Sequence, residues 1–397
     1  MSTAIILAAG EGTRLQPLTD TKPKVMLPVA GKPILHHVLD SLVENNIKDI
    51  GIVIGYKKEA ILDSLTDYNK ANLTYYTQDK QLGTAHALLQ AQEHKPQEPF
   101  LVLPGDNIID PASIHKLYSI KEEYGILINK TDTPAYYGVV DTRSDDTLKS
   151  LTEKPKQNQT PQYVSTGIYK FPPSIFSKLK SQTQQGENTL SDLISTLLYD
   201  NISIHSVNAE TWYDVTYPWD LLALNETMLN PKQHTSGTIE NNVTIKGPVS
   251  IGEKTRIGAG CYLVGPLSIG SNCEIGPNTV IYPTTTISDF CVIDSNCEIR
   301  NSIIMDNTHI GSGSYLSHSI IAENCNLRHG FSTITGPALI HRTNGFRQYS
   351  KVGALVGSDS LINNQVVVCA GKTIGRNCTV APLRTISEDI PTNTKVM

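Results

Sequence analysis

The chain has 397 residues, a formal net charge of −5 and 18% charged residues. This length exceeds what one ordinary hydrophobic core fills, so two domains are expected. The slight acidity, without any block of basic residues, argues against nucleic acid or an anionic membrane as a partner. No apolar stretch approaches the length of a membrane span, and the N-terminus is typical of a strand rather than of a secretion signal. A soluble, cytoplasmic protein is expected.

A glycine-containing turn follows the first predicted strand. That strand is an apolar run typical of a buried parallel strand, and it ends before Gly10 and Gly12. Glycines at this spacing let successive N–H groups form an anion-binding concavity that a phosphate can approach closely. Arg14 and Lys24 add cations suited to phosphate oxygens. The turn is therefore predicted to bind a triphosphate, although a bare G-x-G spacing also fits an ordinary strand-to-loop turn. It has neither the ending of a Walker loop nor the spacing of a dinucleotide fingerprint.

Helix-like and strand-like segments alternate over residues 1–229, as they do in an α/β fold. A polar, turn-rich stretch at 230–237 is the expected linker to a second domain at 238–397. The predicted elements of the first domain are, in chain order, a helix at 33–45, a strand at 50–54, a helix at 84–92, strands at 100–103, 125–129 and 138–141, a helix at 190–198, a strand at 202–207 and a helix at 220–228.

After Gly237 an aliphatic residue recurs at a strict six-residue period. This period fits neither an amphipathic helix nor a hairpin meander. It predicts a parallel β-helix, in which each aliphatic side chain points inward and stacks on its equivalents in the coils above and below. The repeating residues are Ile239, Ile245, Ile251, Ile257, Leu263, Ile269, Ile275, Ile281, Ile287, Ile293 and Ile299.

The phase of this repeat slips after Ile299 and blurs between Arg328 and Lys351, before it returns at Ile362. Such a break predicts either a loop that leaves one edge of the solenoid or a distorted coil. Six of the seven cysteines lie four residues after a hexad position, and there is no C-x-x-C pair. They are predicted to fill the stacked core as small apolar side chains rather than to bind metal or form disulfides.

Two aspartates are candidate metal ligands. Asp106 follows the strand predicted at 100–103, and open α/β sheets bind their ligands at the carboxyl ends of strands. Asp214 lies in a short loop after the strand predicted at 202–207. Carboxylates are the hard oxygen ligands that Mg²⁺ prefers, and one or two of them suffice when phosphate oxygens supply the rest. The alternatives are an Asx turn for Asp106 and a surface acid for Asp214.

The full N-terminal string, G-x-G-T-R-L-x-P-L-T-x-x-x-P-K-x-x-x-P-V, resembles the sugar-1-phosphate nucleotidyltransferase family, and the resemblance extends over nearly the whole chain. It implies Mg²⁺-dependent transfer from UTP or dTTP to a sugar 1-phosphate, with Asp106 and Asp214 on the metal and Arg14 and Lys24 as catalytic cations. It also implies a left-handed β-helix and a homotrimer assembled through it. The nucleotide-binding positions implied are Leu7, Ala8, Ala9, Gly10, Gly12, Thr13, Gln78, Gly83, Thr84 and Gly105.

Several of these assignments concern the base and the sugar. The string Q-x-x-x-L-G-T-A-H-A resembles the family's base-reading segment, because an amide offers both a donor and an acceptor to a pyrimidine edge. His86, within it, is predicted to pack or to be a satisfied polar residue. The sugar-binding positions implied are Gly138, Glu153, Lys154, Ser165 and Thr166. Relatives that use N-acetylglucosamine 1-phosphate often carry asparagine at Ser165, so the sugar stays open between this compound and glucose 1-phosphate.

The β-helix resembles the acetyl-CoA-dependent domain of two-domain relatives that also acetylate an amino-sugar 1-phosphate. Tyr315, Lys351, Gly353 and Ala354 match that pattern, whereas Ser312 replaces the expected histidine. His309, His318 or His329 could supply the missing base. The sequence therefore leaves acetyl transfer as an open second activity. A different class of function, a regulatory or scaffold protein that assembles through the β-helix, is the alternative, and the intact cation and carboxylate set argues against it.

Overall fold

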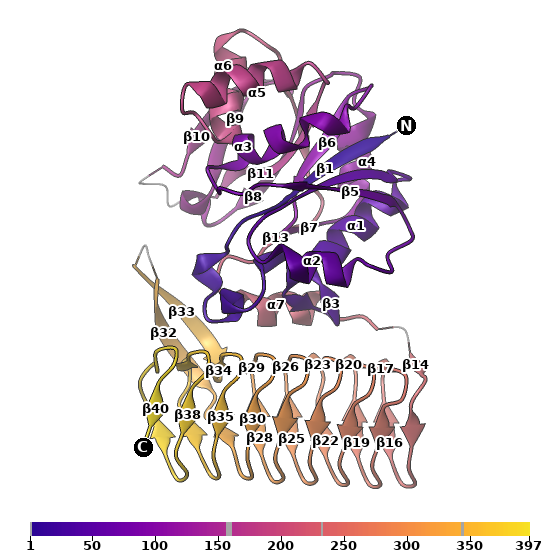
Figure 1. Ribbon diagram of the computed structural model, residues 1–397, viewed down its shortest axis with the longest axis vertical. Helices are drawn as coiled ribbons and strands as arrows, with labels where there is room; N and C mark the ends of the chain where they lie inside the picture. Colours follow the sequence, from indigo (N-terminus) through magenta and orange to yellow (C-terminus); the bar gives the residue numbers. More distant parts are fainter. Residues whose placement is uncertain (1, 156–160, 232, 343–344) are drawn as a thin grey trace. The chain divides into compact units, whose positions relative to one another are not determined.

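The computed structural model (Figure 1) describes residues 2–155, 161–231, 233–342 and 345–397. Its contacts divide the chain into two compact units. The first unit contains the residues up to Gly12, Lys22–Met26 and Pro33–Asp214. The second contains Thr13–Thr21, Leu27–Lys32 and Val215–Met397. The observed division therefore differs from the predicted boundary at residue 229, because the predicted closing helix belongs to the second unit.

A nine-stranded mixed sheet forms the centre of the first unit, with the order β10-β9-β11-β6-β1-β4-β5; off this path, β8 pairs with β11 and β12 pairs with β8. β1, β4, β5 and β6 are parallel, and β11 is antiparallel to β6. The bounds are β1 Thr3–Ala8, β4 Asp49–Ile54, β5 Asn72–Thr77, β6 Phe100–Pro104, β8 Gly125–Thr131, β9 Gly138–Thr142, β10 Leu148–Glu153, β11 Gln162–Phe171 and β12 His205–Asn208.

Helices cover both faces of this sheet, as the alternation of side chains along β1 requires. Ile6 packs in a core with side chains of α1, α2 and α4, while Ile5 packs in a second core with α3, α5 and α6. The predicted α/β Rossmann-like domain is thus confirmed, although β5, α2, α4, α5, β10 and most of β11 were not predicted. The helices are α1 Ile34–Glu44, α2 Lys58–Ser64, α3 Thr84–Gln90, α4 Pro111–Ser119, α5 Ile175–Gln184 and α6 Leu190–Tyr199.

The second unit contains the predicted β-helix, built from three parallel sheets to which successive strands contribute in turn. The first sheet holds β14 His234–Thr235, β17 Val249–Ile251, β20 Leu267–Ile269, β23 Thr285–Ile287, β26 Ile303–Ile304, β29 Ile320–Ile321, β34 Leu355–Val356 and β37 Thr373–Ile374. The second holds β15 Thr238–Ile239, β18 Arg256–Ile257, β21 Glu274–Ile275, β24 Val292–Ile293, β27 His309–Ile310, β30 Asn326–Leu327, β35 Leu361–Ile362, β38 Thr379–Val380 and β40 Lys395–Val396. The third holds β16 Thr244–Lys246, β19 Tyr262–Val264, β22 Val280–Ile281, β25 Glu298–Arg300, β28 Tyr315–Ser317, β31 Ser332–Thr333, β36 Val367–Val368 and β39 Thr385–Ile386.

Two local features explain why the hexad phase slips. Ile287 pairs with Ile304 and Ile304 with Ile321, so these coils have lost one residue each at a corner. The blurred stretch is a hairpin of β32 (Gly336–Arg342) and β33 (Gly345–Val352) inserted between two coils. The linker prediction needs correction, because β14 lies inside it and already pairs with β17. β14 contains no aliphatic residue, and backbone pairing does not require one. The hexad repeat therefore did not predict this strand.

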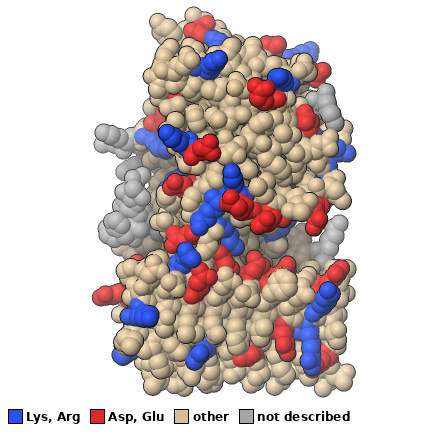
Figure 2. Space-filling model, viewed as in Figure 1, with Lys and Arg blue, Asp and Glu red and all other residues tan. Residues whose placement is uncertain are grey.

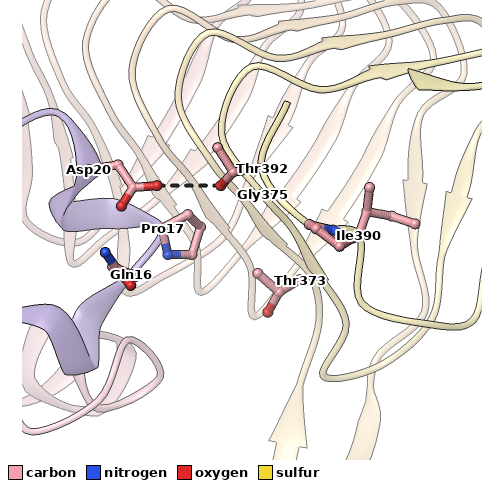
Figure 3. A pocket seen from close by; sticks show the side chains of 8 residues that line it. Gln16, Pro17, Asp20, Thr373, Gly375, Ile390 and Thr392 are labelled. Carbon is pink, nitrogen blue, oxygen red and sulfur yellow. Dashed lines mark hydrogen bonds between the residues drawn. The ribbon is translucent and has the colours of Figure 1, made fainter. Parts of the chain in front are cut away.

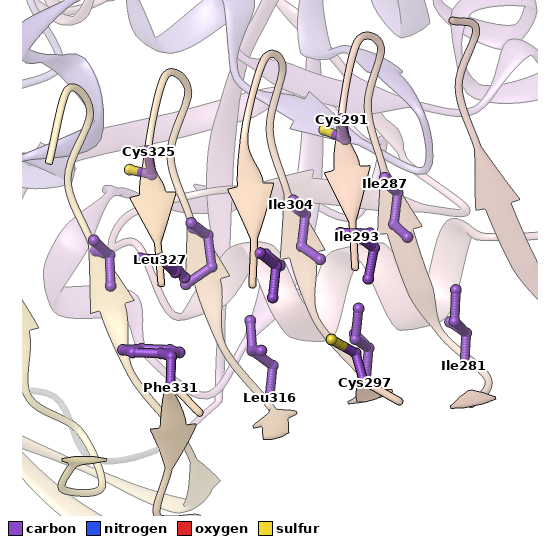
Figure 4. Packing of buried hydrophobic residues seen from close by; sticks show 14 of the residues in the cluster. Ile281, Ile287, Cys291, Ile293, Cys297, Ile304, Leu316, Cys325, Leu327 and Phe331 are labelled. Atoms are coloured by element: carbon purple, nitrogen blue, oxygen red, sulfur yellow. The ribbon is translucent and has the colours of Figure 1, made fainter. Parts of the chain in front are cut away.

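The cysteines fill the core of the β-helix and also bond its corners (Figure 4). All seven are free, and all but Cys369 are buried. The Sγ of Cys291 donates to the carbonyl of Met305 over 3.2 Å, and Cys325 repeats this bond to Gly357 over 3.2 Å. Thr308, at the equivalent corner between them, donates its hydroxyl to the carbonyl of Ala322. The prediction that the cysteines only fill the core as apolar side chains is therefore incomplete. At these corners a cysteine thiol takes the place of a threonine hydroxyl as hydrogen-bond donor to the next coil.

Asn225, in α7 (Asp220–Met228), joins three segments of the second unit. Its side chain is fully buried, and its Oδ1 accepts from the Ala30 amide and from the Thr286 hydroxyl, each over 2.9 Å. Its Nδ2 donates to the Thr284 carbonyl over 3.0 Å. These bonds satisfy the amide and tie α7 to β23 and to the turn at Ala30.

Asn225→Ala is expected to lower the free energy of unfolding by about 2–4 kcal/mol, because buried polar partners would lose their hydrogen bonds. Urea denaturation followed by circular dichroism measures this change. Asn364→Ala is the matched control, since its side chain is exposed on the same β-helix, and it should change stability by less than about 0.5 kcal/mol. An equal, small change in both variants would contradict the role given to Asn225.

Charged side chains of both signs are interspersed among the described residues on the face shown in Figure 2. Within the described residues, no helix combines the length and the apolar character that crossing a membrane would require.

Candidate functional site

Three charged side chains from distant parts of the first unit meet at one point. The Nζ of Lys24 lies 2.6 Å from the Oδ2 of Asp106 and 2.8 Å from the Oδ1 of Asp214. The two predicted metal ligands and one predicted catalytic cation are thus brought together, although 108 residues separate the two acids. Neither the Asx-turn reading of Asp106 nor the surface reading of Asp214 explains this convergence.

The sheet edge positions both acids. Asp106 follows β6 at its carboxyl end, next to the end of β1. A small two-stranded sheet of β7 (Asn107–Ile109) and β13 (Trp212–Asp214) places Asp214 opposite Asn107. The Asn107 side chain is buried and donates to the carbonyl of Thr166 over 2.8 Å, which fixes β7 against β11. Pairing of β13 with β7, rather than proximity in the sequence, therefore brings Asp214 close to Asp106.

Burial and charge act in opposite directions on Lys24. The side chain of Lys24 is only 10% exposed, and burial disfavours its charged form. The carboxylates of Asp106 and Asp214 outweigh burial, so the pKa of Lys24 is raised and its ammonium stays charged at all physiological pH values. Among residues 2–155, 161–231, 233–342 and 345–397, no three His, Cys, Asp or Glu side chains converge on one point. Lys24, Asp106 and Asp214 thus form a cluster of one positive and two negative charges.

The glycine turn leads from β1 toward this site. Leu7 and Ala8 end β1, and the Leu7 carbonyl accepts from the Gly105 amide over 2.8 Å. Gly105 is closely packed, because a Cβ there would lie 3.1 Å from Ile6. Gly10, in contrast, is exposed, and a Cβ there would meet no atom within 4 Å. Contacts within the protein therefore do not explain the glycine at position 10, whereas close approach of a ligand would.

The remaining residues of the predicted triphosphate loop have the following positions. Ala9 is buried, and Gly12 adopts a positive φ of 66°, which a glycine accommodates readily. Thr13 and Arg14 are exposed and begin a 3-10 helix, Thr13–Leu15, which belongs to the second unit.

The predicted base-reading segment is held by buried hydrogen bonds. Gln78 is buried, and its Nε2 donates to the Gly83 carbonyl over 3.1 Å and lies 2.9 Å from the Nδ1 of His86. His86 is thus a satisfied polar residue, as predicted, and it orients Gln78. Gly83 has φ +142°, and a Cβ there would lie 2.3 Å from the Asn188 carbonyl oxygen. The Thr84 hydroxyl accepts from the Leu190 amide over 2.9 Å, so this residue fixes α3 to α6.

The predicted sugar-binding residues fall into two groups. In one group, Glu153 and Gly138 pair across β10 and β9, and a Cβ at Gly138 would lie 3.1 Å from the Glu153 carboxylate. Lys154 follows with an exposed ammonium 3.4 Å from the same carboxylate, which also accepts from the Ser191 hydroxyl over 2.8 Å. The backbone of Gly138 thus faces an acidic side chain, an arrangement that suits a polyhydroxylated ring.

Ser165 and Thr166 form the other group and differ from the prediction that their hydroxyls are donors to a sugar. The Ser165 hydroxyl bonds to that of Tyr169 over 3.1 Å and accepts from the Gly167 amide. The Thr166 hydroxyl donates to the Leu127 carbonyl over 2.9 Å. Pairing of β11 with β8 is irregular between Ser165 and Tyr169, so these hydroxyls satisfy backbone and side-chain groups of the protein itself.

Two aromatic residues at the site, Tyr137 and Trp212, were not predicted from the sequence. The Tyr137 hydroxyl donates to the Oδ2 of Asp214 over 3.3 Å, and the Tyr137 ring lies edge-on to Trp212 at 5.0 Å. Both flank predicted site residues, Gly138 and Asp214, and this adjacency was the signal that could have identified them.

Two of the four predicted acetyltransferase residues are closely packed and two are exposed. Gly353 packs so closely on its neighbour coil that a Cβ would lie 2.1 Å from the Ser317 carbonyl, and Ala354 is fully buried. Tyr315 and Lys351 are exposed. Burial, and then the charge of Lys351, lowers the pKa of His318 to about 4. An imidazole with this pKa is a weak base for a substrate ammonium.

A cavity of about 450 Å³ lies in the second unit (Figure 3). Asp20 is the charged residue in its lining. The lining residues are Gln16, Pro17, Asp20, Thr373, Gly375, Ile390, Pro391 and Thr392.

Comparison with known proteins agrees with this organisation. Residues 3–230 match the family described as Nucleotidyl transferase, and residues 263–396 match the GMPPB C-terminal domain. The bifunctional protein GlmU of Methanococcus maripaludis is 36% identical over 400 residues, which cover 98% of this chain and 95% of that protein. The UTP–glucose-1-phosphate uridylyltransferase AglF of Haloferax volcanii is 36% identical over 226 residues, covering 55% of this chain and 92% of that protein.

A crystal structure from Bacillus anthracis, described as a glucose-1-phosphate thymidylyltransferase, has a TM-score of 0.52 and 27% identity. The match covers 57% of this chain and 94% of the chain in that crystal structure. The N-terminal motif, the two-domain architecture and these matches lead to one conclusion. The chain belongs to the sugar-1-phosphate nucleotidyltransferase family, in the GlmU-like form that carries a β-helix after the transferase domain.

Proposed function

We propose that this chain transfers a uridylyl or thymidylyl group from UTP or dTTP to glucose 1-phosphate or N-acetylglucosamine 1-phosphate. An oxygen of the sugar phosphate attacks the α-phosphorus in line, the bond to the bridging oxygen breaks, and pyrophosphate leaves with that electron pair. The observation that carries the proposal is the convergence of Lys24, Asp106 and Asp214 at the carboxyl edge of the sheet. AglF, whose name specifies UTP and glucose 1-phosphate, supports the choice of substrates.

The donor set fits Mg²⁺. Asp106 and Asp214 offer hard oxygen ligands, and both approach one cationic nitrogen within 2.8 Å, so they converge on a single positive charge. These two residues would hold the ion, which would offset the negative charge of the triphosphate when bound. Arg14 and the amides from Gly10 to Thr13 bind the triphosphate in this proposal. Gln78 and Gly83 orient the base, and Lys24 and Lys154 offset the negative charge of the reacting phosphates.

Pyrophosphate release with a panel of substrates tests the proposal. UTP and dTTP are each combined with glucose 1-phosphate, glucosamine 1-phosphate and N-acetylglucosamine 1-phosphate in the presence of Mg²⁺. We expect turnover with one or more of these pairs. The absence of turnover with every pair, in a folded protein, would favour the regulatory or scaffold alternative.

Acetyl transfer by the β-helix is a second candidate, supported by the GlmU relatives, whose printed name is bifunctional. His318, which is half-buried close to the charge of Lys351, is the candidate base for this activity. Thiol release from acetyl-CoA with glucosamine 1-phosphate measures it. His318→Ala should abolish the release if this histidine participates.

A further inference from the structure

The ammonium of Lys24 occupies the place between the two proposed metal ligands. It contacts one oxygen of each, at 2.6 Å from Asp106 and 2.8 Å from Asp214. The other oxygen of Asp214 accepts from the Tyr137 hydroxyl over 3.3 Å. Three of the four carboxylate oxygens are therefore engaged by donors of the protein itself. Lys24 and Asp214 are 10% and 12% exposed, so solvent screens this arrangement only weakly.

A divalent ion would bind the same carboxylates that these donors contact. Mg²⁺ binds oxygen at about 2.0–2.1 Å, so an ion held by both carboxylates would lie within a few ångströms of the Lys24 ammonium in its present position. Like charges a few ångströms apart in a poorly screened site also repel strongly. The two acids, without a cation between them, would repel each other in the same way. Lys24 thus both holds the acids together and competes with a metal for them.

We propose that Lys24 is an internal counter-ion that excludes divalent metal from Asp106 and Asp214 until a nucleoside triphosphate arrives. The triphosphate offers the ammonium a new anionic partner and supplies further oxygen ligands, so the nucleotide and the metal enter together. The free protein then binds divalent metal poorly. This inference deepens the proposed function and rests on it, since it takes the two acids as the metal ligands.

Mn²⁺ serves as the probe, because the free ion gives an electron paramagnetic resonance signal that disappears on binding. The full chain, as wild type and as Lys24→Met, is titrated with Mn²⁺ without nucleotide and then with UTP. We expect Lys24→Met without nucleotide to bind Mn²⁺ at least about tenfold more tightly than the wild type, because one nearby positive charge has been removed. Lys116→Met is the control, since it removes a lysine from a surface ion pair with Glu210, and it should match the wild type.

Thermal unfolding provides a readout that does not depend on activity. Lys24→Met removes the cation between two facing carboxylates, so it should melt below the wild type without metal and recover when Mn²⁺ is added. Mn²⁺ alone should leave the wild-type melting temperature unchanged. The double variant Lys24→Met/Asp106→Asn should show no Mn²⁺-dependent recovery, which would place the ion at these acids.

The outcomes separate this inference from the function on which it rests. Equally tight Mn²⁺ binding by the wild type and by Lys24→Met, both without nucleotide, would overturn the counter-ion role while leaving the transferase proposal intact. A wild type that binds no Mn²⁺ even with UTP, and that releases no pyrophosphate, would overturn the proposed function itself.

Discussion

Asp106→Asn is expected to lower kcat for pyrophosphate release by about 10³-fold or more, because a carboxylate that holds a metal contributes several kcal/mol to stabilising the transition state. Asparagine keeps the size of the side chain and can still approach the Lys24 ammonium through its carbonyl. The fold should therefore survive, and the loss should appear mainly in kcat. Steady-state kinetics of pyrophosphate release, with saturating UTP and sugar 1-phosphate, measures it.

Asp200→Asn provides the matched control for this experiment. Asp200 forms an ion pair with Lys178 over 2.7 Å at the surface of the first unit, where the two side chains are 41% and 37% exposed. Its loss should leave kcat within about twofold of the wild type, since exposed ion pairs contribute little. A fully active Asp106→Asn variant would show that this carboxylate does not hold the metal.

Gly83→Ala is expected to disrupt the predicted base-reading segment. A Cβ at this position would lie 2.3 Å from the Asn188 carbonyl oxygen and 2.9 Å from its carbon, and φ is +142°. The clash is with backbone, so no side-chain rotation relieves it. The same carbonyl accepts from the Ala85 amide, so its displacement would also disturb the start of α3. We expect a loss of about 2–3 kcal/mol in stability and a rise of at least about tenfold in KM for UTP.

Gly186→Ala separates backbone strain from this clash. Gly186 also has a positive φ, +88°, but a Cβ there would meet no atom within 4 Å. Gly186→Ala should lower the free energy of unfolding by about 1 kcal/mol and leave the KM for UTP unchanged. The measurements are chemical denaturation and KM for UTP at fixed sugar 1-phosphate. Equal effects of the two substitutions on KM would contradict the assignment of Gly83 to the nucleotide site.

The β-helix was predictable because its signal lies in the sequence itself, with the aliphatic residues from Ile251 to Ile299 buried in one continuous core. The prediction weakened where the backbone, not the side chains, sets the structure. A corner shortened by one residue near Asn301, which has a positive φ of 38°, shifts the phase without any change of composition. The hairpin of β32 and β33 is held by antiparallel backbone pairing, which the hexad repeat does not predict.

The site was predictable only in part. Asp106 follows a buried strand, a position that points to ligand binding by itself, whereas Asp214 is identified by resemblance and placed by the pairing of β13 with β7. Tyr137 is next to a predicted site residue in the sequence, but its bond to Asp214 depends on the path of a distant strand and could not be predicted. Ser165 and Thr166 were assigned to a sugar by resemblance to the family. Their partners inside the protein emerge only in three dimensions.

The central claim is that the carboxylates of Asp106 and Asp214 form one metal site for a nucleoside triphosphate. Crystals of the full chain grown with UTP and Mn²⁺, and measured for the anomalous scattering of manganese, test it most directly. The account predicts one anomalous peak within coordination distance of both carboxylates, about 2.0–2.3 Å, with the triphosphate on the same ion and the Lys24 ammonium displaced from between the acids. A manganese peak away from Asp106 and Asp214, with UTP bound, would contradict it.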